Sequence, residues 1–216
     1  MKEKRNILKE ALFMGAVNIC YKPDITYEDE KLQNAELTEP CIIICNHMSA
    51  EDGVVVRYLF RNKNVCSLMA KDLLEKPFFK YLVGDCQCIP VDRKNASTKW
   101  IHECEEQMKE GKSVIIFPEG TTIKENAVED FKSGFIMLAM TTGAKVLPVA
   151  TNGKYKLFSR KKLRFKVGTP MSLNISKMTV SGIEDEAERF KNIVKNMYDE
   201  LDEDDSVSEY KNTNIA

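Results

Sequence analysis

The chain has 216 residues, of which 43% are hydrophobic and 30% are charged. This length and composition fit one soluble globular domain with a sizeable core, and they exclude a wholly disordered chain. The 32 basic and 33 acidic residues leave a formal net charge of -1, which does not favour bulk attraction to nucleic acid.

The N-terminal segment is strongly apolar behind a basic flank. Almost every residue in Ala11–Tyr21 is apolar, and Lys2, Lys4 and Arg5 precede it. No small-residue cleavage site follows, and the segment is too short for a bilayer-spanning helix. We therefore predict a helix within residues 1–21. It either packs on the core or lies at a membrane surface with a cationic collar, and both alternatives stay open.

The cysteines and histidines do not form a recognisable framework. Seven cysteines are present, several of them inside apolar runs, with only two histidines and no C-x-x-C pair. An odd number at these positions supports neither a disulfide framework nor a zinc site. We therefore expect a reduced, cytosolic interior and no metal ion.

Short apolar runs alternate with helical patterns after a polar link at 22–40. Continuous apolar runs predict strands buried on both faces at Cys41–Cys45, Val65–Met69, Cys86–Val91, Ser113–Phe117 and Lys145–Ala150. Helical patterns are found at Asp52–Phe60, Leu73–Val83, Trp100–Met108 with a stop at Gly111, and Phe131–Thr142. Leu163, Phe165 and Val167 alternate with basic residues, which predicts a sixth strand near a sheet edge.

Strands that alternate with helices at this pitch predict an α/β fold with a largely parallel central sheet flanked by helices. A last amphipathic helix is predicted at Ile183–Leu201. The domain plan is thus an N-terminal helix at 1–21, a main domain at 22–201, and an acidic tail at 202–216 that we expect to be disordered. In parallel sheets ligands bind beyond the carboxyl ends of the strands, so the residues after each strand are the candidates for chemistry.

A histidine and an aspartate follow the first buried strand. The sequence there reads Asn46-His47-Met48-Ser49-Ala50-Glu51-Asp52. If a helix opens near Ser49, then Asp52 can accept a hydrogen bond from one imidazole nitrogen of His47. That bond would fix the tautomer and leave the other nitrogen as a base. The alternative is a helix cap made by Ser49 and Asp52 beside an incidental histidine.

Further polar residues follow three other strands. Pro118-Glu119-Gly120-Thr121 comes after the fourth strand, Lys71 after the second and Arg93 after the third. A guanidinium suits a phosphate monoester, a lysine adds positive charge, and glycine lets backbone amides approach a ligand closely. Each also has an ordinary alternative, namely a turn or a surface ion pair with Asp72 or Asp92. Their convergence at strand ends favours a functional site.

Two of these motifs together resemble the glycerolipid acyltransferase family. They are Asn46-His47-x-x-x-x-Asp52 and Phe117-Pro118-Glu119-Gly120-Thr121, and similar blocks lie at Gly84–Arg93, Phe131–Gly134 and Val146–Val149. The resemblance spans about residues 40–170. It implies the glycerol-3-phosphate acyltransferase fold, with His47 as general base and Asp52 as its orienting partner. It also implies that Arg93, Glu119, Gly120 and Thr121 bind the glycerol phosphate acceptor, with Lys71 adding charge.

The sequence departs from the family at one position. Members usually carry arginine directly after the Gly-Thr, whereas this chain has Thr122. A contact with the acceptor phosphate is then missing, or Lys124, Lys132 or Lys71 supplies it. The departure bears on the identity of the acceptor more than on the type of reaction.

The resemblance implies transfer of a fatty acyl chain from acyl-CoA or acyl carrier protein to the hydroxyl of lysophosphatidic acid, giving phosphatidic acid, with no further cofactor. An imidazole suits removal of the alcohol proton, and an activated thioester needs no covalent enzyme intermediate, in line with the absence of a G-x-S-x-G elbow. The helix after Ser49 would supply amides to the oxyanion. The alternatives are another lysophospholipid or amino lipid as acceptor, a thioesterase, or a lipid-binding module without turnover.

Amphiphilic substrates imply contact with a membrane. Seven lysine and arginine residues lie between positions 154 and 166, and each could contribute about 1 kcal/mol of attraction to anionic lipid. The alternative is a solvated basic edge strand that discourages aggregation. We expect a cytoplasmic protein, peripheral on the inner face of the membrane.

Overall fold

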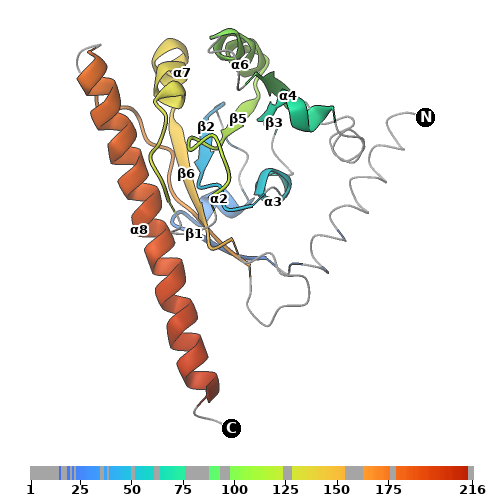
Figure 1. Ribbon diagram of the computed structural model, residues 1–216, viewed down its shortest axis with the longest axis vertical. Helices are drawn as coiled ribbons and strands as arrows, with labels where there is room; N and C mark the ends of the chain where they lie inside the picture. The colour runs from blue at the N-terminus through green and yellow to red at the C-terminus, as the bar shows by residue number, and fades with distance from the viewer. Residues whose placement is uncertain are drawn as a thin grey trace.

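The computed structural model shows a single mixed sheet with helices packed on both of its faces (Figure 1). It describes residues 15, 19, 21, 23–34, 37, 39–49, 52–60, 64–75, 88–92, 98–123, 128–153, 163–175 and 179–213. No helix in these ranges combines the length and the apolar character needed to cross a bilayer.

The sheet has seven strands in the order β1-β7-β6-β2-β5-β3-β4. Their bounds are β1 Asp24–Tyr27, β2 Ile42–Cys45, β3 Val65–Ala70, β4 Cys88–Val91, β5 Ser113–Ile116, β6 Val146–Thr151 and β7 Arg164–Val167. Strands β6, β2, β5, β3 and β4 are parallel neighbours, whereas β7 runs antiparallel to β6 and parallel to β1. The predicted α/β fold with a largely parallel sheet is confirmed.

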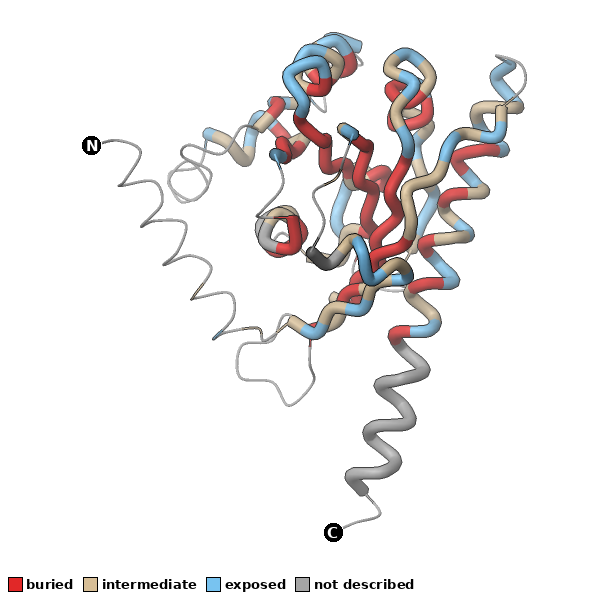
Figure 2. The backbone as a smooth tube through the Cα atoms, turned by 180° about the vertical axis from the view of Figure 1, so that it is seen from behind, coloured by how far each residue is buried: buried red, intermediate tan, exposed pale blue. Residues whose placement is uncertain are grey.

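The helices cover the two faces unequally. Their bounds are α2 Lys31–Asn34, α3 Asp52–Leu59, α4 Lys71–Leu74, α6 Lys99–Lys109, α7 Gly134–Thr142 and α8 Val180–Thr213. Side chains along β2 alternate between the faces: Ile42 and Ile44 join the cluster with α6, α7 and α8, while Ile43 joins the cluster with α3. Figure 2 shows that the central strands are buried and form the core of the molecule. Burial on both faces explains why these strands read as continuous apolar runs.

One prediction, that of a polar link before the first buried strand, needs correction. The segment at 22–40, taken as a polar link, contains β1 and α2. Strand β1 is half exposed along its length, so it lacks the apolar run of a buried strand. It pairs with β7, which therefore lies second from the edge of the sheet, in agreement with the prediction of a strand near a sheet edge.

The C-terminal end of the chain differs from the predicted domain plan, and most of the N-terminal end lies outside the described residues. Helix α8 runs to Thr213, beyond the predicted end at Leu201 and through most of the tail expected to be disordered. No glycine or proline follows Gly182, so nothing in the sequence stops helix propagation there. The predicted helix at 1–21 lies almost entirely outside the described residues. Of the three that are described there, Ile19 is 71% exposed and Tyr21 packs against the core on the α3 face.

Candidate active site

Five parallel strands end on the same side of the sheet, which we call its carboxyl edge. In lateral order these are β6, β2, β5, β3 and β4. The residues that follow β2, β5 and β3, namely His47, Glu119 and Lys71, therefore lie along the same edge. Arg93, after β4, falls outside the described residues. The sequence-based placement of the candidates at neighbouring strand ends holds for those that the structure describes.

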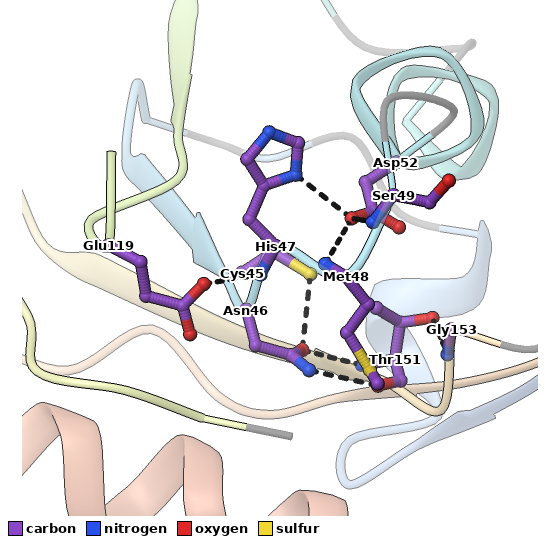
Figure 3. Close-up of polar contacts among 9 residues, drawn as sticks. All are labelled: Cys45, Asn46, His47, Met48, Ser49, Asp52, Glu119, Thr151 and Gly153. Atoms are coloured by element: carbon purple, nitrogen blue, oxygen red, sulfur yellow. Dashed lines mark hydrogen bonds and ion pairs between the residues drawn. The ribbon is translucent and has the colours of Figure 1, made fainter. Parts of the chain in front are cut away.

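His47 and Asp52 are in direct contact. Nδ1 of His47 lies 2.9 Å from Oδ2 of Asp52, and the same oxygen accepts the backbone N–H groups of Met48 at 2.6 Å and Ser49 at 2.8 Å (Figure 3). Asp52 is the first residue of α3 and its side chain is fully buried, whereas the His47 side chain is 13% exposed. The predicted pairing is confirmed, and it is combined with a cap-like role for Asp52.

The contact with Asp52 sets the tautomer of the His47 imidazole. A carboxylate oxygen can only accept hydrogen bonds, so the Nδ1–H of His47 donates and the lone pair remains on Nε2. The ring of Phe117 stacks on the imidazole, with 4.4 Å between the centroids and 27° between the planes. Two independent contacts therefore orient the imidazole with Nε2 directed away from Asp52.

Glu119 braces the backbone of this turn. Its Oε2 accepts the backbone N–H of His47 at 2.7 Å, and its Oε1 accepts that of Glu129 at 3.2 Å. The residue is only 4% exposed. The resemblance implied a role in acceptor binding, but the structure commits both carboxylate oxygens to backbone amides, and this favours a positioning role.

Burial raises the pKa of Glu119 from its ordinary 4.5 to about 7. The hydrogen bonds from His47 and Glu129 oppose this rise because they favour the ionised form, while the charge of Asp52 adds to it. Desolvation outweighs the two hydrogen bonds. Glu119 therefore holds a proton in the folded protein at pH values where it would be ionised in the unfolded chain.

Glu119 should make the folded protein less stable as the pH rises. Between pH 4.5 and about 7 the folded state binds more protons at this group than the unfolded state does, so its contribution falls by about 3 kcal/mol across that range. Urea denaturation at a series of pH values measures the slope. Glu119→Gln should remove this component, whereas Glu39→Gln, at an exposed carboxylate, should leave it. Identical slopes for wild type and Glu119→Gln would contradict the assignment.

Lys132 lies over the turn that follows β5. Gly120 has a φ of +74°, in the left-handed region, and a Cβ at this position would lie 2.6 Å from Nζ of Lys132. Of the three lysines weighed as substitutes for the missing arginine, Lys71 and Lys132 are both exposed, and Lys124 lies outside the described residues. Thr121, one residue past the turn glycine, is exposed.

Some of the backbone N–H groups that were expected to bind the oxyanion already donate hydrogen bonds within the protein. Helix α3 begins at Asp52, later than an opening at Ser49. The amides of Met48 and Ser49 already donate to Asp52, and the amide of His47 donates to Glu119. These three groups are therefore structural and hold the histidine turn in place.

Asn46 ties the histidine turn to the neighbouring strand, a role that sequence analysis missed. Its Nδ2 donates to the carbonyl of Thr151 at 2.9 Å, and its Oδ1 accepts the Thr151 N–H at 2.8 Å (Figure 3). The fully buried side chain thus links the end of β2 to the end of β6. Its place beside His47 in the motif was the available signal, but its partner lies 105 positions away.

Comparison with known proteins agrees with this arrangement. The acyltransferase family model matches residues 24–152, more than half of the chain. The 1-acyl-sn-glycerol-3-phosphate acyltransferase of Pseudomonas aeruginosa is 33% identical over 135 residues, which cover 61% of this chain and 51% of that protein. The protein of the same name from Cocos nucifera is 30% identical over 145 residues, which cover 66% of this chain and 46% of that protein. The chain spans about half the length of the curated relatives it matches.

A solved structure has the same fold. The crystal structure of the 1-acyl-sn-glycerophosphate (LPA) acyltransferase PlsC from Thermotoga maritima aligns with a TM-score of 0.64, covering 94% of this chain and 98% of that one at 21% identity. The family match spans both strand-end motifs, those of His47 and of Glu119. The chain therefore belongs to the acyltransferase family.

Proposed function

We propose that the protein transfers a fatty acyl chain from a thioester to the hydroxyl of lysophosphatidic acid, giving phosphatidic acid. The observation that carries the proposal is the contact between His47 and Asp52 at the carboxyl edge of the sheet, in a chain of the acyltransferase family. The names of the relatives favour lysophosphatidic acid as the acceptor. We propose acyl-CoA or acyl carrier protein as the donor, without a metal ion or further cofactor.

The arrangement of His47 suits general base catalysis of this reaction. As the acceptor oxygen attacks the thioester carbonyl carbon, its proton passes to Nε2 of His47 and a C–O bond forms. The buried carboxylate of Asp52 stabilises the imidazolium that results. Collapse of the tetrahedral intermediate breaks the C–S bond, and the imidazolium returns the proton to the departing thiolate. No oxidant or reductant is needed.

We propose that the acceptor headgroup binds along the strand ends beside His47. Arg93 and Lys71 would supply positive charge, and the turn at Gly120 and Thr121 would line the site. Glu119, next to Gly120, ties that turn to the histidine turn by accepting the His47 amide. A phosphate monoester needs several donors, and cationic side chains at neighbouring strand ends can supply them.

Because both substrates are amphiphiles, we propose that the protein works as a peripheral protein on the inner face of the cytoplasmic membrane. The basic stretch at 154–166 favours attraction to anionic lipid. Within it, Lys166 forms ion pairs with Glu28 and Glu200, so that charge is already compensated. Lys166 therefore adds less to this attraction than an uncompensated lysine would.

An acyl-transfer assay tests the proposed function. Purified full-length protein is given acyl-CoA or acyl carrier protein with vesicles that contain lysophosphatidic acid, another lysophospholipid, an amino lipid or monoacylglycerol. Phosphatidic acid should be the preferred product, and protein should sediment with anionic vesicles. Product on another acceptor alone would overturn the acceptor, and free fatty acid alone would indicate a thioesterase. If no acceptor is acylated and no fatty acid is released, the remaining interpretation is a lipid-binding module without turnover.

A further inference from the structure

Lys132 reaches the β5 turn from the segment that precedes α7. Its backbone N–H donates to the carbonyl of Pro118 at 2.9 Å, which ties the segment to the turn. Its Nζ lies 2.6 Å from the point that a Cβ of residue 120 would occupy. The ammonium group therefore sits over the turn, in space that only a glycine at position 120 leaves open.

The packing of the residues on either side of Lys132 fixes the position of its backbone. Two residues later, a Cβ on Gly134 would lie 2.9 Å from the indole of Trp100, so α7 begins in close contact with α6. One residue earlier, Phe131 packs edge-to-face on Phe135, with 6.2 Å between the ring centroids. In the block Phe131–Gly134, the phenylalanine and the glycine thus anchor the backbone, and the lysine between them reaches the turn.

The charge of Lys132 is not compensated within the part of the chain that the structure describes. No carboxylate there lies at ion-pair distance from its Nζ, whereas Lys191 and Lys195 each have an acidic partner. The neighbouring Glu119 directs both oxygens to backbone amides instead. An exposed ammonium group that lies over the β5 turn, with no counter-ion among the described residues, is suited to bind an anionic group of a substrate.

We propose that Lys132 binds the phosphate monoester of the acceptor and thereby sets acceptor specificity. The inference rests on the proposed function, and it identifies a source of positive charge at a turn where Thr122 carries none. The exposed Thr122 carries no charge, and Lys132 brings a cation to the same turn. Because the phosphate is bound in the ground state and the transition state alike, the contact acts on KM.

Replacing Lys132 by alanine should raise the KM for lysophosphatidic acid about 10- to 100-fold, the range expected for one charge-assisted hydrogen bond. The kcat and the KM for the acyl donor should stay within about twofold. Lys132→Arg should retain a low KM, and adding Thr122→Arg to Lys132→Ala should restore it. Lys145→Ala, at an exposed lysine on the opposite edge of the sheet, is the matched control. An unchanged KM in Lys132→Ala would overturn the inference.

Glycine substitutions test the same contact without removing the lysine. Gly120 and Gly143 both have left-handed φ values, +74° and +68°, so alanine strains the backbone similarly at each position. Only at position 120 does the new Cβ collide with Nζ of Lys132. Gly120→Ala should therefore raise the KM for lysophosphatidic acid, and Gly143→Ala should not. Equal effects of the two substitutions would contradict the proposed position of the ammonium group.

A binding measurement separates this inference from the proposed function. Isothermal titration calorimetry compares lysophosphatidic acid with monoacylglycerol, which lacks the phosphate, in detergent micelles. Wild type should prefer lysophosphatidic acid, and Lys132→Ala should lose that preference. A preference retained in Lys132→Ala, or absent in wild type, overturns the inference even if wild type forms phosphatidic acid. A preference that depends on Lys132 in a protein that forms no phosphatidic acid overturns the proposed function alone.

Discussion

Replacing His47 by alanine is expected to lower kcat for acyl transfer about 10²- to 10⁴-fold, the usual contribution of a positioned general base. Nε2 of His47 is the basic atom of a ring held by Asp52 on one side and Phe117 on the other. The backbone bond from residue 47 to Glu119 does not depend on the side chain, so the turn should keep its shape. Steady-state kinetics with lysophosphatidic acid and acyl-CoA measure the loss.

The second histidine of the chain provides a matched control for His47→Ala. His102 lies on α6, its side chain is 70% exposed, and its acidic neighbours are Glu105 and Glu106. His102→Ala should leave kcat and both KM values unchanged. If His47→Ala retains wild-type kcat, or if His102→Ala loses as much, then the imidazole of His47 is not the base and the mechanism given above fails.

The fold was predictable where burial is symmetrical. Strands β2, β5 and β6 are buried throughout, and their sequences are accordingly continuous apolar runs. Strand β1 has only four residues and alternates between exposed and half-buried positions, so it resembles a polar link. The parallel pairing of β1 with β7 is a tertiary contact between segments far apart in the chain. No local pattern indicates it, and this is why β1 was taken as part of a polar link.

The candidate site was predictable only in its local part. His47 and Asp52 lie five positions apart, across a strand end and a helix start, so their contact follows from local geometry. The role of Glu119 depends on an amide 72 positions away, and the position of Lys132 over the β5 turn depends on the packing of α7 on α6. Sequence analysis could therefore name Lys132 as one of three candidate lysines, but it could not choose among them.

Removal of the Asp52 carboxylate should damage both folding and catalysis. One buried oxygen of Asp52 accepts the amides of Met48 and Ser49 and the imidazole of His47. Asp52→Ala leaves two half-buried amides without an acceptor, at up to about 1–3 kcal/mol each, so the free energy of unfolding should fall by up to about 2–6 kcal/mol. Urea denaturation measures this loss. Asp130→Ala, at a side chain that is 98% exposed, should cost less than about 1 kcal/mol.

Asparagine at position 52 separates the two roles of the carboxylate. Its amide oxygen can still accept the Met48 and Ser49 amides and the His47 Nδ1–H, so Asp52→Asn should be more stable than Asp52→Ala. It carries no negative charge to stabilise the imidazolium, however, and kcat should still fall about 10²- to 10⁴-fold. A stable Asp52→Asn protein with full activity would mean that the charge beside His47 has no part in catalysis. A protein as unstable as Asp52→Ala would mean that the hydrogen bonds themselves require the charge.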